Sequence, residues 1–146
     1  MMLIELSAEE YTNLTGVDYS QLAIDLATRV AKDQEHKITF KVADLLDDVC
    51  VEILGKFNIV HDKGTYDAVA LMENAMEKRA TYIKNVATLL EDDGYFIITS
   101  CNFTDDELIE SFTSTFSKHA VIPTQTFMFG GKQGNIVTSL VFKKCV

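Results

Sequence analysis

Residues 92–100 read DDGYFIITS, and this stretch decides the fold class. Asp92, Asp93 and Gly94 predict a turn, and the YFIIT run that follows predicts a strand that is apolar on both faces. Such a strand is typical of the middle of a parallel sheet, because helices cover both faces of a parallel sheet. We therefore expect an α/β protein.

Helical and strand-like runs alternate on the N-terminal side of this stretch. Residues 3–10 predict the tail of a helix, and Leu22, Leu26 and Val30 lie on one face of the next helix. The helix at 75–90 is expected to bury Tyr82, Val86, Leu89 and Leu90. Strands are expected at 13–18, 38–43 and 57–60, and helices at 20–31, 45–54 and 75–90. This alternation predicts a parallel sheet with right-handed crossovers.

The C-terminal side predicts one more helix and a hairpin. Thr104 to Glu107 form a capping box that opens a helix with Leu108, Phe112 and Phe116 in line. Two strand-like runs follow, around 120–129 and 135–143, with Gly130, Gly131 and Gly134 between them. Glycines between two strand-like runs indicate a β-hairpin, which would make the last strand antiparallel.

Composition limits the class of protein. The 146 residues, 47% of them hydrophobic, suit a single domain over residues 1–146 with one core. A net charge of −9 argues against a nucleic-acid partner and is compatible with a basic one. Cys50, Cys101 and Cys145 form no CxxC pair, so we expect no metal site, no disulfide framework and a reducing compartment. No apolar run reaches the roughly 18 residues of a membrane span.

Polar residues follow four of the expected strands. They are Asp18, Asp44, Asp62 and the run from Ser100 to Asn102. Ligands of open α/β sheets bind outside the carboxyl ends of the strands, where an acidic residue can accept hydrogen bonds from both ribose hydroxyls. From position alone, a helix-cap or turn role suits Asp18 and Asp44 better than a ligand role.

The run HDKGTYD, residues 61–67, places two opposite charges and a flexible backbone at a strand end. One interpretation is a ligand site at Asp62, Lys63 and Gly64. The other is a surface ion pair, worth little, with Gly64 in a turn. Asn102 fits the mouth of a site or an Asx turn before Thr104 equally well.

Five strings carry a resemblance to a known family. They are VDYS (17–20), VADLL (42–46), FNIVHDKGTYDAVAL (57–71), YFIITSCNFTDDEL (95–108) and FMFGGKQGNIVTSLVF (127–142). Together they resemble the eukaryotic lysine methyltransferases of translation elongation factor 1-alpha, over nearly the whole chain. HDKGTYDA followed by ITSCNFT is the specific part of this match.

The resemblance implies a Rossmann-like, seven-stranded class I methyltransferase sheet with an antiparallel C-terminal hairpin. It implies an S-adenosylmethionine-dependent protein-lysine N-methyltransferase that acts on elongation factor 1-alpha in the cytoplasm, with the nucleus as a second location. By motif, Asp18 would hold the cofactor ribose, and Tyr19, Asp44 and Leu45 would lie at the adenine. The remaining implied site residues line the methyl-transfer mouth (Asp62, Lys63, Gly64) and the acceptor channel (Asn102, Phe103). Asp62 and Asn102 are the candidates for steering the lysine amine.

The sequence departs from the family at its N-terminal end. The family begins with a strand and a D-x-G-x-G loop, whereas this match starts inside the helix that follows them, and no GxG precedes Asp18. We therefore expect an N-terminally incomplete sheet, lacking a strand between those that end at Asp18 and Asp62, and weak cofactor binding. The alternatives are a catalytically inactive fragment or isoform, and a small-molecule methyltransferase of the same fold.

Overall fold

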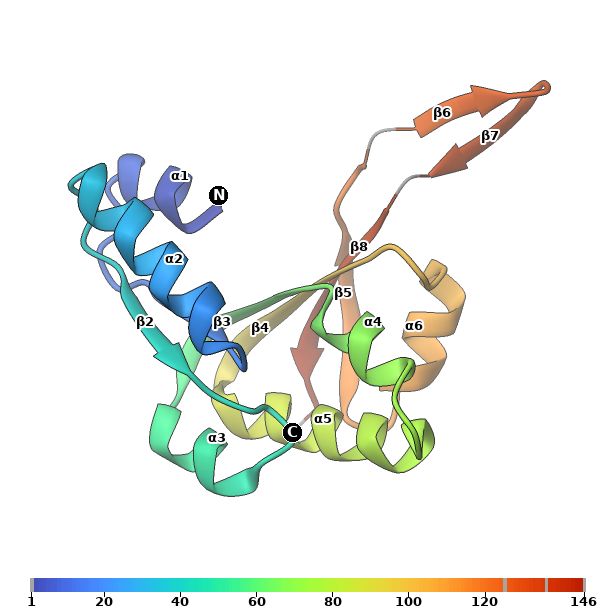
Figure 1. Cartoon of the computed structure of the whole chain (residues 1–146). Helices are drawn as coiled ribbons and strands as arrows, with labels where there is room; N and C mark the ends of the chain where they lie inside the picture. Colours follow the sequence, from blue (N-terminus) through green and yellow to red (C-terminus); the bar gives the residue numbers. More distant parts are fainter. Residues whose placement is uncertain (1, 125, 136, 146) are drawn as a thin grey trace. The chain divides into compact units, whose positions relative to one another are not determined.

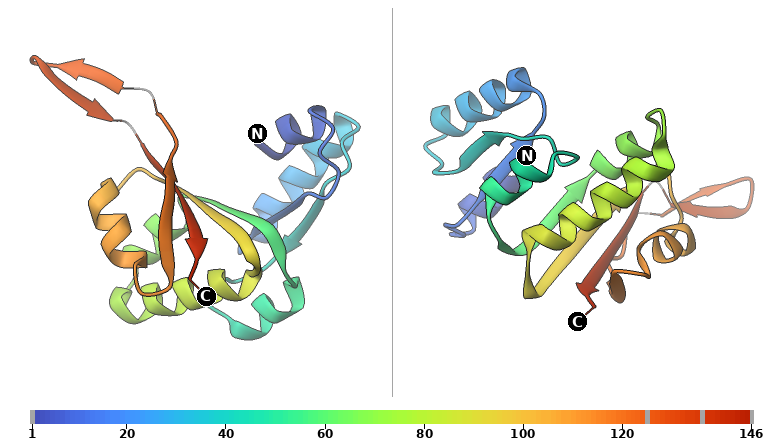
Figure 2. Two further views of the ribbon diagram at one scale, coloured as in Figure 1. Left: turned by 180° about the vertical axis from the view of Figure 1, so that it is seen from behind. Right: turned by 90° about the horizontal axis from the view of Figure 1, so that it is seen from below.

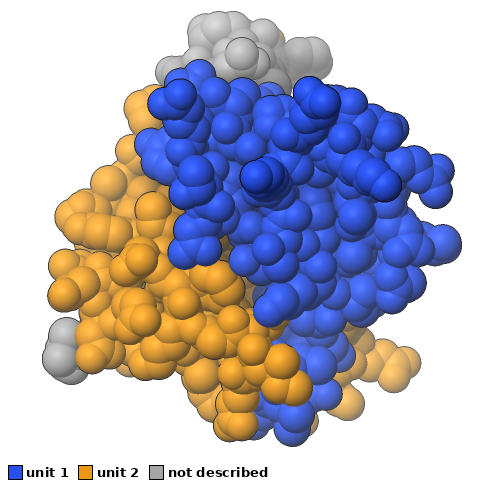
Figure 3. Space-filling view, turned by 90° about the vertical axis from the view of Figure 1, so that its left-hand side faces the viewer, with its two compact units in different colours: residues 1–50 blue, residues 51–146 orange. Residues whose placement is uncertain are grey.

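A computed structural model describes residues 2–124, 126–135 and 137–145. The chain divides into two compact units, Met1–Cys50 and Val51–Val146, which Figure 3 colours separately. No helix in the described ranges is long and apolar enough to cross a membrane. The same residues contain no cluster of His, Cys, Asp and Glu that could hold a metal ion.

The first unit is built on one parallel strand pair. Its helices are α1 (Met2–Ala8) and α2 (Gln21–Asp33), and its strands are β1 (Thr15–Asp18) and β2 (Thr39–Val42). β1 and β2 pair in parallel, with Asp18 opposite Val42, and α2 makes the crossover between them. Gly16 allows β1 to approach β2, because a Cβ there would lie 2.7 Å from the Phe40 ring. This strand–helix–strand unit confirms the expected alternation.

The apolar face predicted for α2 is exposed. Ser20 caps the helix as expected, accepting a hydrogen bond from the Ala23 N–H. However, Leu22 is 81% exposed and Leu26 is 59% exposed, and the helix buries Ile24 and Ala31 instead. The periodicity identified the helix but not the face that it buries.

The second unit contains a four-stranded mixed sheet in the order β3-β4-β8-β5 (Figure 1). Its strands are β3 (Phe57–Lys63), β4 (Leu90–Ser100), β5 (Phe116–Val121) and β8 (Thr138–Lys144). β3 and β4 pair in parallel, and β8 is antiparallel to both β4 and β5. The YFIIT run therefore lies inside the sheet, as the sequence predicted, and the C-terminal strand is antiparallel.

The turn predicted at residues 92–94 is wrong. β4 begins at Leu90 and passes through these residues. The pairing moves from Phe57 opposite Leu90 to Ile59 opposite Tyr95, so β4 absorbs extra residues in an irregularity of the ladder. A bulge of this kind keeps a strand paired while accommodating residues that would otherwise form a turn.

Phe116 is also misplaced by the sequence pattern. The last helix, α6, covers Asp105–Phe112, and Phe116 is the first residue of β5. The intervening Thr113, Ser114 and Thr115 explain the early end, because hydroxyl side chains compete for backbone hydrogen bonds and disfavour helix interiors.

The C-terminal region has more strands than the two expected runs. β6 (Thr126–Phe129) and β7 (Lys132–Asn135) form a separate hairpin between β5 and β8. Its turn is Gly130-Gly131, at φ of 57° and 78°, which glycine adopts without strain. Gly134 lies within β7 and not between strands.

Helices α4 (Thr65–Ala70), α5 (Ala75–Leu89) and α6 pack against the four-stranded sheet (Figure 2) and share the core of the second unit with it. A short helix, α3 (Asp48–Leu54), spans the division between the units. The four residues predicted as the buried stripe of the helix at 75–90 are all buried, but Leu90 is the first residue of β4 and not part of α5. The Phe112 ring lies 4.9 Å from the Tyr66 ring and 5.3 Å from the Phe142 ring, so aromatic packing joins α4, α6 and the sheet.

Hydrogen bonding in the described residues forms separate sheets. β1 and β2 make one, and the four strands around β4 make another. Within each unit, the parallel strand pair joined by helices is consistent with a truncated Rossmann-like fold. The absence of a strand between those that end at Asp18 and Asp62 stays a prediction.

Candidate active site

The two acidic residues of the first unit follow the same edge of its sheet. Asp18 ends β1 and Asp44 comes shortly after β2. Asp18 Oδ1 accepts from the Ser20 N–H at 2.8 Å, and Asp44 Oδ1 accepts from the Leu46 N–H at 2.8 Å. These are Asx turns, so the turn interpretation of both residues is correct.

The turns leave room for a ligand role as well. Both carboxylates are exposed, and Oδ2 of each has no hydrogen-bond partner in the described part of the chain. Tyr19 is 79% exposed, and Leu45 is half-buried. The first unit thus presents two acceptor oxygens and an aromatic ring beyond its strand ends, a set that fits a ribose and an adenine.

In the second unit, Asp62 is the residue that organises the end of β3. Its side chain is buried, Oδ1 accepts from the Thr65 N–H at 2.7 Å, and Oδ2 accepts from the Tyr66 N–H at 2.8 Å. Oδ2 also accepts from the Tyr82 hydroxyl. Gly64, the N-cap of α4, has no side chain, so Asp62 satisfies the first N–H groups of that helix in its place.

Tyr82 is held as a neutral donor by its surroundings. Burial and the neighbouring negative charge of Asp62 raise the pKa of Tyr82 well above its usual value of 10.0. The hydroxyl therefore keeps its proton and donates a hydrogen bond to the carboxylate. Both Asp62 oxygens are engaged, which gives Asp62 a structural role at the strand end; its assignment to steering an amine stays a prediction.

His61 and Lys63 flank Asp62 on β3 but differ in environment. The His61 Nε2 lies 3.1 Å from the Thr99 hydroxyl oxygen, which lies 2.9 Å from that of Ser139. Burial lowers the pKa of His61 below 6.5, and this outweighs the opposing charge of Asp62. Lys63 is exposed and Gly64 has a φ of 92°, a left-handed conformation that favours glycine.

A second buried carboxylate, Asp67, fixes the segment after β4. Asp67 Oδ1 accepts from the Ser100 hydroxyl at 2.5 Å, and Oδ2 accepts from the Cys101 N–H at 2.9 Å. The Ser100 oxygen in turn accepts from the N–H groups of Asn102 and Phe103, at 3.2 and 3.1 Å. Four polar contacts therefore determine the backbone of residues 100–103.

Asn102 is exposed beside this network, and within the described ranges its side-chain amide has no partner. Phe103 packs 5.3 Å from the Tyr66 ring and 5.3 Å from the Arg79 guanidinium. The amide of Asn102 is thus available to a ligand, while its neighbour is anchored in the fold.

The second unit brings the mouth residues and the acceptor residues to one edge. β3 and β4 are parallel and Lys63 pairs with Thr99, so residues 62–64 and 100–103 follow neighbouring strand ends. Sequence reasoning missed the roles of Asp67, Arg79 and the Tyr82 hydroxyl. The position of Asp67 at the end of the HDKGTYD run could have indicated a role at the site. The sequence pattern predicted Tyr82 only as a member of an apolar stripe.

Comparison with known proteins identifies the family. Residues 2–144 match the family described as "Methyltransferase domain". The chain belongs to this family. The match of the methyltransferase domain spans both compact units.

Named relatives of this methyltransferase domain act on lysine. It is 42% identical over 99% of its length to "EEF1A lysine methyltransferase 2" of Mus musculus. It is 36% identical over 98% of its length to "Protein-lysine N-methyltransferase EFM4" of Saccharomyces cerevisiae. The chain spans 59% of the length of the mouse protein and 65% of the yeast one.

Solved structures confirm the class I methyltransferase fold. The TehB-like SAM-dependent methyltransferase of Corynebacterium glutamicum is similar at a TM-score of 0.70 and 17% identity, over 99% of this chain and 74% of that one. The N-methyltransferase NodS of Bradyrhizobium japonicum, in complex with S-adenosyl-L-homocysteine, is similar at a TM-score of 0.67 and 16% identity. The similarity covers 90% of this chain and 66% of that one.

Proposed function

We propose that this protein is an S-adenosylmethionine-dependent protein-lysine N-methyltransferase that acts on translation elongation factor 1-alpha. The observation that carries the proposal is the 42% identity, over 99% of the chain, to a protein named as a lysine methyltransferase of that factor. Because the proposed substrate is a translation factor, the proposed location is the cytoplasm, with the nucleus second.

The residues of the first unit fit the adenosine part of the cofactor. Asp18 keeps Oδ2 for ribose hydroxyls while Oδ1 holds its own turn. Asp44 offers one oxygen in the same way, and Tyr19 and Leu45 supply surface for the adenine. When bound, the cofactor supplies an electrophilic methyl group on a sulfonium.

The residues of the second unit serve the acceptor lysine. A free lysine titrates near 10.4, so the attacking amine must lose its proton, and a desolvated channel favours the neutral form. The Asn102 amide oxygen can accept from the amine and orient its lone pair, and Phe103 offers an apolar wall. Asp67 and Ser100 hold the backbone that carries Asn102 and Phe103. Positioning of this kind contributes much of the rate of a displacement.

A methylation assay tests the proposal directly. Labelled S-adenosylmethionine and purified elongation factor 1-alpha should yield labelled methyl-lysine, and Asn102→Ala should reduce the rate while leaving cofactor affinity unchanged. Transfer to small-molecule amines but not to the factor would favour the alternative of a small-molecule methyltransferase.

The cofactor site has its own test in Asp18. Asp18→Ala removes a charged acceptor, which costs on the order of 1.5–3 kcal/mol, about tenfold or more in affinity. Asp18→Asn keeps an oxygen for the Ser20 turn and separates turn from ligand effects, and Asp25→Ala on exposed α2 is the control. Unchanged affinity of Asp18→Ala by calorimetry would reject this assignment.

A further inference from the structure

A groove on the second unit concentrates positive charge on an acidic protein. Its volume is about 770 Å³, and it follows α5 between Lys56 and Lys144 at one end and Arg79 at the other. Its described lining includes four of the 13 Lys and Arg residues of the chain and no Asp or Glu. On a chain of net charge −9, such a lining is opposite in sign to the molecule as a whole.

The floor of the groove is apolar. Ala80, Ile83 and Ala87 recur along α5 at helical spacing and line it, and Met76 extends it at 88% exposure. Ser111 and Thr115 contribute hydroxyl groups along the opposite wall. Arg79 lies toward one end of this apolar strip, Lys56 and Lys144 lie at the other, and Lys84 adds a charge between them. Such a strip is complementary to a ligand that carries carboxylates toward both ends and apolar groups between them.

The cations differ in how firmly they are held. The Arg79 guanidinium donates to the Tyr66 hydroxyl oxygen and the Ser111 hydroxyl oxygen, both at 2.8 Å, which uses two of the five N–H groups of a guanidinium. Arg79 is thereby fixed with donors to spare.

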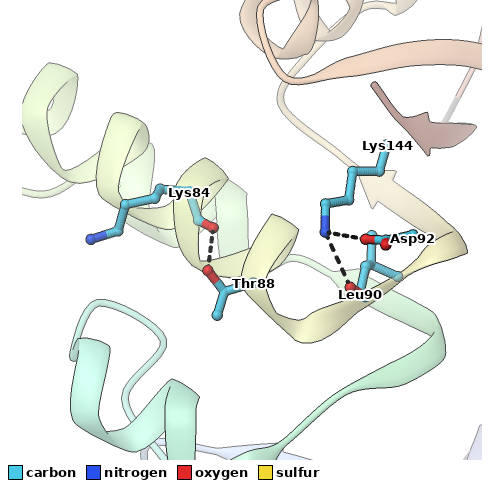
Figure 4. Close-up of polar contacts among 5 residues, drawn as sticks. All are labelled: Lys84, Thr88, Leu90, Asp92 and Lys144. Atoms are coloured by element: carbon cyan, nitrogen blue, oxygen red, sulfur yellow. Dashed lines mark hydrogen bonds and ion pairs between the residues drawn. The ribbon is translucent and has the colours of Figure 1, made fainter. Parts of the chain in front are cut away.

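Lys144 approaches the Leu90 carbonyl at 3.3 Å and Asp92 at 3.5 Å, just beyond the end of α5, as Figure 4 shows beside Lys84 and Thr88. Asp92 is 85% exposed, so this long pair contributes little and can be exchanged for another carboxylate.

We propose that this groove docks an extended, acidic segment of a protein partner. From Met76 to Thr88 the helix rises by about 18 Å at about 1.5 Å per residue. An extended chain covers that length with about six residues at about 3.3 Å each. The fitting segment has acidic residues at both ends and small or apolar residues in the middle. This proposal is independent of the proposed methyl transfer.

Fluorescence anisotropy with a fluorescein-labelled Glu-Glu-Leu-Ala-Glu-Glu peptide and the full chain tests it. We expect saturable binding that weakens as salt rises from about 0.05 to about 0.5 M, because screening shortens the range of charge interactions. The same peptide with Gln in place of Glu should not bind. Absence of binding by the Glu peptide overturns the proposal.

Substitutions locate the binding. The double variant Lys56→Glu, Lys144→Glu replaces two charge attractions to the peptide by two repulsions. It should lower the affinity for the Leu-Ala peptide by about tenfold or more, since an exposed ion pair contributes up to about 1 kcal/mol. Lys118→Glu with Lys143→Glu is the matched control, because it changes the net charge equally at residues outside the groove lining. Equal weakening by both pairs overturns the proposal, and circular dichroism verifies that each variant is folded.

A third peptide separates docking from simple anion binding. Glu-Glu-Gly-Gly-Glu-Glu lacks the apolar centre and should bind more weakly than the Leu-Ala peptide. If both bind equally and inorganic phosphate displaces both, the groove holds small anions only and the docking proposal is wrong.

Discussion

The Asp62–Tyr82 contact shows how much structure one buried carboxylate holds. Asp62 serves two backbone N–H groups of α4 and one hydroxyl of α5, so it joins β3 to both helices. A buried carboxylate is stable only if its oxygens are hydrogen-bonded. The position of the candidate mouth residues, Lys63 and Gly64, therefore depends on this junction.

Tyr82→Phe should destabilise the fold while preserving its packing. The ring is fully buried, so Phe fills the same space, but Asp62 Oδ2 loses its hydroxyl donor. A lost bond to a charged group costs about 1.5–3 kcal/mol of unfolding free energy, measured by urea titration.

Tyr66→Phe is the matched control for that change. Its hydroxyl accepts from the half-buried Arg79, which can turn to water, so its loss should cost less. A loss from Tyr82→Phe no greater than that from Tyr66→Phe would contradict the assigned role of the Asp62 contact.

His61 should make stability fall as the solution becomes acidic. Because burial lowers its pKa in the folded chain below 6.5, the unfolded chain binds more protons as pH falls through 6.5. The free energy of unfolding therefore decreases from pH 6.5 down to the folded pKa and levels off below it. Between pH 8 and pH 5, His61→Gln should lose less stability than the natural chain in urea titrations, and identical losses would contradict the prediction.

At the scale of the element, α6 depends on its first turn. The Thr104 hydroxyl accepts from the Glu107 N–H at 3.3 Å, and Glu107 Oε2 accepts from the Thr104 N–H at 2.8 Å. The Thr104 N–H and the Thr104 hydroxyl both donate to Glu107 Oε2, and these two bonds lower the pKa of the Glu107 carboxyl. The helix carries Phe112 into the aromatic core, so its start affects the packing of the whole second unit.

Thr104→Ala should cost about 1 kcal/mol of unfolding free energy, because it removes the N-cap acceptor. Thr104→Ser keeps the hydroxyl and should cost less. Thermal denaturation of the two variants at neutral pH measures the difference, and equal melting temperatures would show that the capping box contributes nothing to stability.

Local signals predicted the elements better than they predicted their limits. The Thr104 capping box and the Ser20 cap were readable, since each depends on residues within one turn. The path of β4 through Asp92 and Gly94 was not, because strand pairing with β3, far away in the sequence, overrides the turn propensity. The exposed face of α2 was unreadable for a related reason, since periodicity defines a face without saying what covers it.

The candidate site shows the same limit. The pattern of an acidic residue after a strand located Asp18, Asp44 and Asp62 in the sequence. Only the three-dimensional contacts show which of their carboxylate oxygens are hydrogen-bonded within the chain. Asp18 and Asp44 each keep an oxygen available, whereas Asp62 has both oxygens bound. The HDKGTYD run marked Asp67 as a residue of interest, but nothing local in the sequence indicated its partner Ser100, which lies 33 residues away.

At the scale of the whole molecule, the two units differ in how much they bury. In the described residues, the buried hydrophobic side chains of the first unit are Ile24, Ala31 and Ala43, whereas the second contains a cluster of fully buried aromatic residues. The sheet of the first unit has two strands, and a two-stranded sheet is marginally stable on its own. The proposed cofactor residues thus lie on the less buried unit and the proposed acceptor residues on the more buried one.

Backbone amides of the two units should therefore exchange with solvent at two different opening free energies. Peptides that cover β1 and β2 should exchange through local opening, at a lower free energy than peptides that cover β4 and β8, because fewer apolar contacts resist opening there. Mass spectrometry of peptic fragments, with a denaturant series to separate local from global opening, measures both. Amides that pair the first-unit strands, such as those of Thr39 and Ala43, should lose protection without denaturant dependence, as local opening exposes little surface. If β1 and β2 instead open together with β4 at every denaturant concentration, the two units unfold as one cooperative body and the difference in burial has no consequence for stability.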